Sequence, residues 1–225
     1  MLAYKAALHN KTRVTITLEI PQDALTNLNR SSVVAKETAS YRTNKAKVLT
    51  IEDDSGTTYP YAQTRHGSLM GLLYRVGDVV VDPHFDTNLE LEYAGGIHFF
   101  VSRRVVDTYT VVWLDLEGAD SFRRLSSLYE CINYEGPARI QAMRTNGLFE
   151  CWHPNGQVWI RGLFKDGKQG GVWRMWGHDG KKASELLYTN GKLEGIWEAW
   201  KDIGDGLVRK ETQAARGLDS IFIGF

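Results

Sequence analysis

The sequence predicts a mainly β protein, in which an α+β N-terminal domain is followed by an antiparallel β-meander of hairpin repeats. Three observations lead to this fold class. A pattern of glycine and aromatic residues recurs every 24 residues near the C-terminus, which is typical of a repeat array. Asn-Gly and Asp-Gly pairs, the strongest short-range hairpin signal, punctuate the same region. Short β-branched segments with alternating polarity run through the N-terminal half.

Each repeat begins at a glycine, carries aromatic residues two and five positions later, and has a second glycine nine positions later. One complete set is Gly171, Trp173, Trp176 and Gly180. Asn-Gly or Asp-Gly pairs stand at 146–147, 155–156, 166–167, 179–180, 190–191 and 205–206. These pairs tolerate the positive φ of tight turns, and segments of strand length separate them. Each unit is therefore predicted to be two antiparallel strands, and successive units continue one sheet.

Period-2 alternation assigns the first strand of each repeat to two faces. The inner face is predicted to hold Phe149, Cys151, Trp173, Met175, Trp197 and Ala199. The outer face has a charged residue at the centre of each strand, so we expect it to be partly solvent-exposed. Trp152, Trp176 and Trp200 lie on this outer face and are predicted to form a protein-binding ridge. The alternative is that they belong to the core, because a tryptophan buries a large apolar area.

The N-terminal domain, residues 1–110, is predicted to combine strands with two short helices. The strand candidates are Thr12–Ile20, Ala46–Glu52, Val76–Val81 and Ile97–Val101. Helices are expected over Val33–Tyr41 and from the N-cap residue Ser102 to Tyr109.

A bridge of residues 111–145 is expected to hold a strand over Val111–Leu116, a helix over Asp120–Tyr129 and a degenerate repeat. The hairpin repeats occupy residues 146–213, and an apolar tail occupies residues 214–225. The tail offers a second candidate protein contact through Ile221, Phe222 and Phe225. Because an exposed strand of this kind aggregates, we expect the tail to pack on the array or to add as a strand to a partner.

Composition excludes several classes of function. The formal net charge is zero, so no long-range field attracts nucleic acid or an anionic membrane. No apolar run reaches the ~20 residues that span a bilayer, and the N-terminus lacks the pattern of a signal peptide, so we expect a soluble intracellular protein. The two cysteines are expected to be reduced thiols, and no zinc ligand set is complete. No catalytic, cofactor or metal site is predicted.

His98 stands in an apolar strand segment and is the residue most open to a chemical role. It could act as a general base or ligand, or it could be a core histidine bonded to backbone groups. The second interpretation is favoured because no nucleophile or paired carboxylate stands at a diagnostic spacing, and a small-molecule site around His98 stays open. Four acidic residues surround Pro83-His84 and predict either a solvated loop or, less favoured by their spacing, a cation site: Asp82, Asp86, Glu90 and Glu92.

The array resembles MORN repeats of the variant that reads Gly-x-Trp-x-x-Trp-x-x-x-Gly, with a later aromatic residue and glycine. Residues 171–180 fit this pattern, and Tyr188 and Gly191 follow it, whereas the third unit departs from it at Thr212 and Ala215. The resemblance implies a scaffold that binds proteins, dimerises or associates with membranes.

The N-terminal domain resembles an uncharacterised domain that large DNA viruses of amoebae attach to pentapeptide and MORN repeats. The matching stretches are Tyr4-Lys5, Leu18–Ala24, Arg42 with Lys45–Val48, Tyr74–Gly77 and Gly96–Phe100. Tyr93 departs from the pattern, where a cysteine is expected, which weakens the idea of a Cys/His chemical site. Taken together, the two halves resemble a MORN-repeat protein of the marseillevirus type.

The resemblance and the missing catalytic motifs predict a non-enzymatic structural protein. It would be a minor capsid, cementing or scaffold component of the virion, present in the host cytoplasm during assembly. Expected partners are capsid or other virion proteins, or further copies of the chain; nucleic acid is not expected, and the neutral charge disfavours membranes. The alternative is an enzyme or effector with ADP-ribosyltransferase-like chemistry, because Gly96–Phe100 followed by Tyr109 loosely resembles a segment of those enzymes. In that case His98 or Tyr109 would flank nicotinamide.

Overall fold

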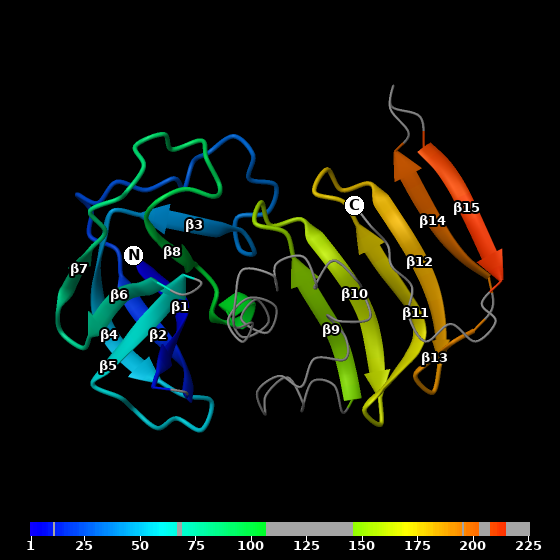
Figure 1. Ribbon diagram of the computed structural model, residues 1–225, viewed down its shortest axis with the longest axis horizontal. Helices are drawn as coiled ribbons and strands as arrows, with labels where there is room; N and C mark the ends of the chain where they lie inside the picture. The colour runs from blue at the N-terminus through cyan, green and yellow to red at the C-terminus, as the bar shows by residue number, and fades with distance from the viewer. Residues whose placement is uncertain (11, 67–68, 107–145, 195, 203–207, 215–225) are drawn as a thin grey trace. The chain divides into compact units, whose positions relative to one another are not determined.

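The computed structural model describes residues 1–10, 12–66, 69–106, 146–194, 196–202 and 208–214. Figure 1 shows strands throughout this part of the chain, and the strands pair in antiparallel sheets. The predicted mainly β class is therefore confirmed. The described residues divide into two compact units, one holding the residues up to 106 together with Pro154–Gly156, the other holding the rest. The predicted bridge elements lie outside the described residues, as does the apolar tail apart from Ala214.

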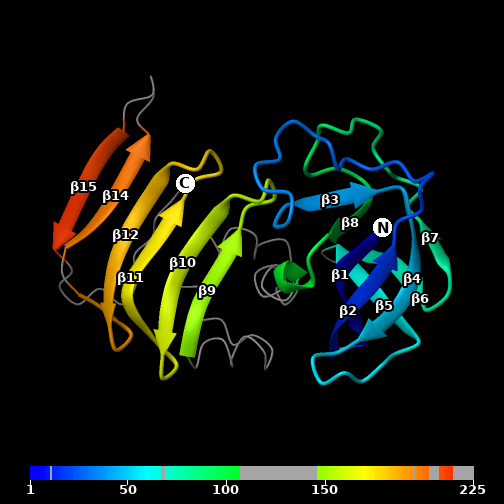
Figure 2. The same ribbon diagram turned by 180° about the vertical axis from the view of Figure 1, so that it is seen from behind.

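The sheet of the first unit has eight strands among the described residues. They are β1 (Leu2–His9), β2 (Thr12–Glu19), β3 (Ser40–Thr43), β4 (Lys45–Glu52), β5 (Tyr61–His66), β6 (Leu69–Arg75), β7 (Val79–Val81) and β8 (Ile97–Phe100). Their order is β3-β8-β1-β2-β4-β7, with β5 paired to β1 and β6. Because β1 pairs with β8 at Tyr4 and with β5 at Leu8, the sheet forks along β1. β6 returns beside β7, so the sheet curls back on itself (Figures 1 and 2).

Alternating apolar residues build the core of this unit. Val14, Ile16 and Leu18 of β2 are fully buried, and β1 places Ala7 and Ala3 opposite Val14 and Leu18. Directly opposed residues in antiparallel strands project to the same side, so these side chains share one core face. Each of the four predicted N-terminal strands coincides with or overlaps an observed strand, namely β2, β4, β7 and β8, and β4 begins one residue before its predicted start.

The predicted helix over Val33–Tyr41 is wrong, because this segment consists of turns that lead into β3. Polar tertiary contacts replace the helical hydrogen bonds. The buried Arg30 donates from Nη1 to the Ser40 carbonyl oxygen at 2.7 Å, and Ser40 and Tyr41 then pair with β8. The helix predicted from Ser102 begins where expected, since residues 103–106 are helical; its predicted end at Tyr109 lies outside the described residues.

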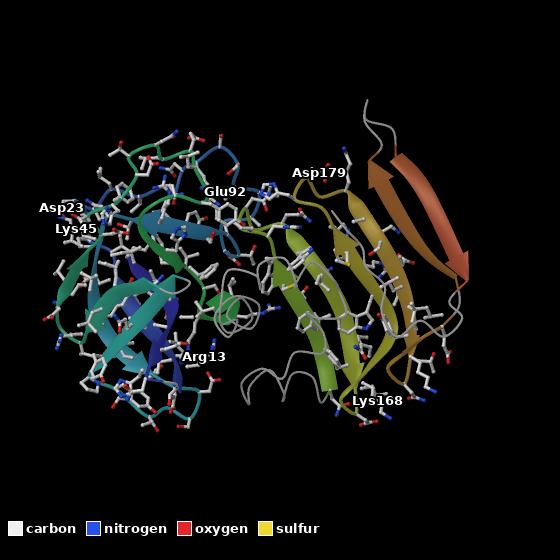
Figure 3. The ribbon with its side chains drawn as sticks, in the orientation of Figure 1. Arg13, Asp23, Lys45, Glu92, Lys168 and Asp179 are labelled. Atoms are coloured by element: carbon white, nitrogen blue, oxygen red, sulfur yellow. The ribbon has the colours of Figure 1, made fainter. Side chains whose placement is uncertain are left out.

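Arg42 fixes the acidic loop that connects β7 to β8. Its side chain is 0% exposed and donates hydrogen bonds to carbonyl oxygens of Asp86 at 2.7 Å, Leu91 at 2.9 Å and Gly95 at 3.0 Å. It also donates to the carbonyl oxygen of Asn88. The loop is therefore held by main-chain acceptors around one guanidinium. On the surface of the same unit, Lys45 and Asp23 form an ion pair of 2.6 Å (Figure 3).

The second unit is the predicted meander. Its strands are β9 (Asn146–Trp152), β10 (Val158–Lys165), β11 (Lys168–Trp176), β12 (Lys182–Thr189), β13 (Lys192–Leu193), β14 (Ile196–Asp202) and β15 (Val208–Ala214). They follow the order β15-β14-β12-β11-β10-β9, with β13 beside β12. Successive hairpins thus continue one sheet, with Lys168 and Asp179 at opposite ends of its strands (Figure 3).

The Asn-Gly and Asp-Gly signals identify most of the turns. Asp166-Gly167 joins β10 to β11 with φ values of 52° and 72°, the positive pair that a two-residue type I′ turn requires. Asn190-Gly191 repeats this geometry after β12. Asn146-Gly147 is an exception, because these residues begin β9 and pair with Lys165 and Phe164, so no hairpin turn forms there.

Candidate functional site

The repeat sheet has a buried inner face and an exposed outer face, as the alternation predicts. Phe149 and Cys151 of β9 are 3% exposed, and Trp173 and Met175 of β11 are 0% exposed. The Trp173 ring lies 5.7 Å from the Phe149 ring and 5.1 Å from the Phe164 ring between centroids. The inner face of β9–β12 is therefore an aromatic core, and the outer face is the one that these strands leave exposed.

A charged row crosses the outer face at the middle of four strands. Strand register places Glu150 opposite Arg161, Arg161 opposite Arg174, and Arg174 opposite Glu185. Arg161 Nε donates to Glu150 Oε1 at 2.7 Å, and Arg174 Nε donates to Glu185 Oε2 at 2.8 Å. Hydrogen bonds from Lys182 and Arg174 hold the pKa of Glu185 below its ordinary value. These four side chains carry two positive and two negative charges. The exposed Arg174–Glu185 pair stabilises the fold by only about 0–1 kcal/mol, whereas Glu150 of the other pair is buried.

An aliphatic row lies beside the charged row. Leu148 is 47% exposed, Leu163 53%, Val172 38% and Leu187 41%. Leu148 stands opposite Leu163 between β9 and β10, and Val172 stands opposite Leu187 between β11 and β12. Single exposed leucines are normal, but apolar side chains gathered on one face of a sheet indicate an interaction surface. We call these four residues the aliphatic row.

The predicted tryptophan ridge is described in part. Trp152 and Trp176 are half-buried and therefore less exposed than the aliphatic row. The Arg161 guanidinium carbon lies 5.9 Å from the Trp176 ring centroid, a cation–π distance, so Trp176 adjoins the charged row. The side chain of Trp200 and the tail residues Ile221, Phe222 and Phe225 lie outside the described residues. Their roles stay predictions.

Sequence reasoning missed the aliphatic row, although a signal for it exists. Leu163 and Leu187 stand in the second strand of their repeats, two residues from Arg161 and Glu185 respectively, and so share a face with them. Period-2 alternation in the second strand of each repeat therefore predicts that both leucines lie on the solvent-exposed outer face.

The candidate residues of the first unit are engaged in structural contacts. His98 Nε2 lies 2.9 Å from the Ala94 carbonyl oxygen. Asp82 and Asp86 each accept a backbone N–H two residues ahead, and Glu90 accepts both the backbone N–H and the hydroxyl of Ser31. The hydrogen bonds from Ser31 lower the pKa of Glu90. Within the described ranges, no group of three or more acidic, histidine or cysteine side chains is placed to hold a metal ion.

Comparison with known protein families gives a match for the first unit. Residues 1–105 match DUF5758, a family of unknown function. All of β1–β8 lies inside the matched range, whereas the repeat sheet lies beyond it. No curated protein and no solved structure matches the chain significantly. In the described part of the chain, helices are too short or too polar to cross a bilayer.

Proposed function

We propose that this chain is a non-enzymatic structural protein that binds other proteins through the outer face of its MORN-like hairpin array. The observation that carries the proposal is the aliphatic row, whose members are 38–53% exposed on one face of β9–β12. The resemblance of both halves to a marseillevirus-type protein supports the assignment of the chain to a virion. It would be a minor capsid, cementing or scaffold component of the virion, present in the host cytoplasm during assembly.

The outer face suits a protein partner because it combines two kinds of recognition. The aliphatic row supplies apolar area, and the adjacent charged row supplies hydrogen-bonding groups without net charge. An uncharged surface gains little from a polyanion such as nucleic acid, whereas it can match the mixed surface of another protein. The half-buried Trp176 at the edge of the charged row extends the apolar area.

The size of the aliphatic row limits the affinity that it can supply. Full burial of an exposed leucine contributes about 1.5–3 kcal/mol, so four half-exposed side chains contribute about 3–6 kcal/mol together. A micromolar complex requires about 8 kcal/mol, and association itself has an entropic cost. The outer face therefore needs a second contact, a role that the predicted tail residues Ile221, Phe222 and Phe225 would fill.

The experiment tests particle incorporation and proximity together. A photo-crosslinking amino acid is placed at Leu163 or, as the matched control, at Leu73 of β6, which is 40% exposed. We expect the full-length chain in purified virions, with cross-links from position 163 to a capsid protein and none from position 73. Leu163→Glu should lower incorporation at least tenfold, while Leu73→Glu leaves it unchanged. A chain that is absent from particles and forms no cross-links at position 163 would refute the proposal.

A further inference from the structure

The turn that follows β9 is buried within the first unit. Pro154, Asn155 and Gly156 all belong to this unit and are buried, and Asn155 is only 2% exposed. The N–H of His153 donates to the carbonyl oxygen of Gln157 at 2.8 Å and closes the turn. We call the three buried residues the docked turn.

The equivalent turn of the next repeat is exposed. It lies 24 residues later, where the N–H of Gly177 donates to the carbonyl oxygen of Lys181, also at 2.8 Å. Gly156 and Gly180 stand at the same position of the two turns and have φ values of 89° and 80°. Residues 178–180, which we call the exposed turn, are nevertheless all exposed to solvent. The same local geometry is thus buried in one repeat and exposed in the next, so burial is not a property of the repeat itself.

Arg30 and Ser40 bind the first carbonyl oxygen of the docked turn. Arg30 Nη2 donates to the carbonyl oxygen of Pro154 at 2.8 Å, and the Ser40 N–H donates to the same oxygen at 2.9 Å. Arg30 is 3% exposed, and two of its other N–H groups are paired with Ser32 Oγ at 3.1 Å and the Ser40 carbonyl oxygen at 2.7 Å. A buried guanidinium that is held in this way is costly to leave without its remaining acceptor, so the site is built around a carbonyl ligand.

Three further donors bind the next two carbonyl oxygens of the docked turn. The N–H groups of Val34 and Ala35 donate to the carbonyl oxygen of Asn155 at 2.9 Å and 3.3 Å. Thr38 Oγ1 donates to the carbonyl oxygen of Gly156 at 2.7 Å. A Cβ at Gly156 would lie 2.1 Å from the Ala35 carbonyl oxygen, so the site requires glycine at this position. Residues 30–40 thus bind all three carbonyl oxygens in succession.

The two turns differ in sequence in a way that matches their burial. The docked turn reads Pro-Asn-Gly, whereas the exposed turn reads His-Asp-Gly. Proline has no N–H, so its burial leaves no backbone donor to satisfy, whereas histidine would bring one. An aspartate in place of Asn155 would bring a charge that costs energy to bury. Pro-Asn-Gly occurs once in the sequence, so each copy of the chain carries one such ligand.

We propose that residues 30–40 form a peptide-recognition site for a hairpin turn that reads Pro-Asn-Gly, and that the site of one copy of the chain binds the turn of a second copy. The contact between Arg30 and Pro154 joins residues 124 positions apart, and its geometry does not depend on their belonging to one chain. Exchange of turns between copies preserves every hydrogen bond of the site, which is why domain swapping has a low energetic cost. Within one copy the chain's own turn competes at a high effective concentration. The inference goes beyond the proposed function and does not rest on it.

Peptide binding to the full-length chain tests the recognition. Pro154→His combined with Asn155→Asp gives the docked turn the sequence of the exposed turn, so the hairpin keeps a sequence that forms this turn while the site loses its ligand. A fluorescent peptide of residues 153–157, cyclised through flanking cysteines, is titrated by anisotropy. We expect this double variant to bind the peptide at least tenfold more tightly than the wild-type chain, whose own turn competes. The matched control, His178→Ala with Asp179→Ala, changes the exposed turn and should bind as weakly as the wild type.

A substitution in the site identifies where the peptide binds. Thr38→Val, added to the double variant, removes the donor to the Gly156 carbonyl oxygen and should weaken peptide binding at least fivefold. A peptide with valine in place of its glycine should bind at least tenfold more weakly. Circular dichroism checks the fold of each variant, and Asn155→Asp alone replaces the double variant if that chain does not fold. A folded turn variant that binds the peptide no more tightly than the wild type would overturn the recognition site.

Mixing two variants tests the second copy as the partner. The double variant has an intact site without its ligand, whereas the single variant Thr38→Val keeps the docked turn but binds it weakly. Sedimentation equilibrium should show a one-to-one complex in the mixture that is at least tenfold tighter than the self-association of either variant alone. A mixture that associates no more tightly than its components would overturn the exchange between copies, even where the peptide binds.

Discussion

Arg42→Met is the substitution whose consequences the structure defines most sharply. The Arg42 guanidinium is fully buried and serves four carbonyl oxygens of the loop between β7 and β8, those of Asp86, Asn88, Leu91 and Gly95. Methionine preserves much of the apolar stem but donates no hydrogen bond. Four acceptors that were paired with a charged donor are then left to find water or to remain unpaired.

The expected loss of stability is about 3–5 kcal/mol. A hydrogen bond to a charged group contributes about 1.5–3 kcal/mol, so four would give about 6–12 kcal/mol if the loop stayed in place. Much of the loop is exposed, however, and its carbonyl oxygens regain water when it detaches. Because the loop can detach locally, the loss of stability is limited to about 3–5 kcal/mol, the value found on breaking a buried charged contact. Arg42→Lys keeps the charge but loses the planar fork, and should cost about 2–3 kcal/mol.

Urea unfolding followed by circular dichroism measures the total loss in the free energy of unfolding. Amide hydrogen exchange shows which segment of the chain loses stability. Protection should fall first in residues 82–96 and later in β1, β2 and β4. The matched control is Arg75→Met in β6, an exposed arginine whose loss should change stability by no more than about 0.5 kcal/mol. Equal stabilities for Arg42→Met and Arg75→Met, or unchanged exchange in the loop, would refute the idea that one guanidinium holds the loop.

Three further outcomes are expected. Gly162→Ala should destabilise the chain by about 1–3 kcal/mol in urea unfolding, because the new Cβ would lie 2.0 Å from Trp173 Cδ2, whereas Gly170→Ala meets nothing closer than 4.0 Å. Burial lowers the pKa of Lys5 to about 8. Lys5→Met should remove a rise in stability between about pH 8 and 10.5, because the folded wild-type chain releases the Lys5 proton at lower pH than the unfolded chain does. At about 1.4 kcal/mol per pKa unit, the difference between the variants reaches at most about 3.5 kcal/mol. Leu163→Glu should leave urea stability within about 0.5 kcal/mol of wild type while it abolishes partner binding, and a large loss of stability would show that Leu163 is structural.

The repeat sheet could be predicted from sequence because its signals are local. Asp166-Gly167 and Asn190-Gly191 specify their turns through backbone geometry, and the period-2 pattern of β11 then decides which face holds Trp173. The first unit was less predictable, because tertiary contacts override local preference. The helix predicted over Val33–Tyr41 does not form where Arg30 and the edge of β8 offer hydrogen bonds instead. Alternation with Arg161 assigns Leu163 to the outer face, but its exposed fraction of 53% depends on what covers that face, which periodicity alone does not decide.

The packing of Trp173 joins the stability of the array to its outer surface. Trp173 belongs to one repeat, yet its ring lies against Gly162 in the second strand of the preceding repeat. Glycine at that position leaves room for the indole, so neighbouring repeats share one core and each depends on the next. On the opposite face, Leu163 follows Gly162 directly, and its row takes one member from each of four strands. The inner aromatic packing thus fixes the spacing of the outer row, and the complete row exists only in the assembled array, since no single hairpin carries all four members.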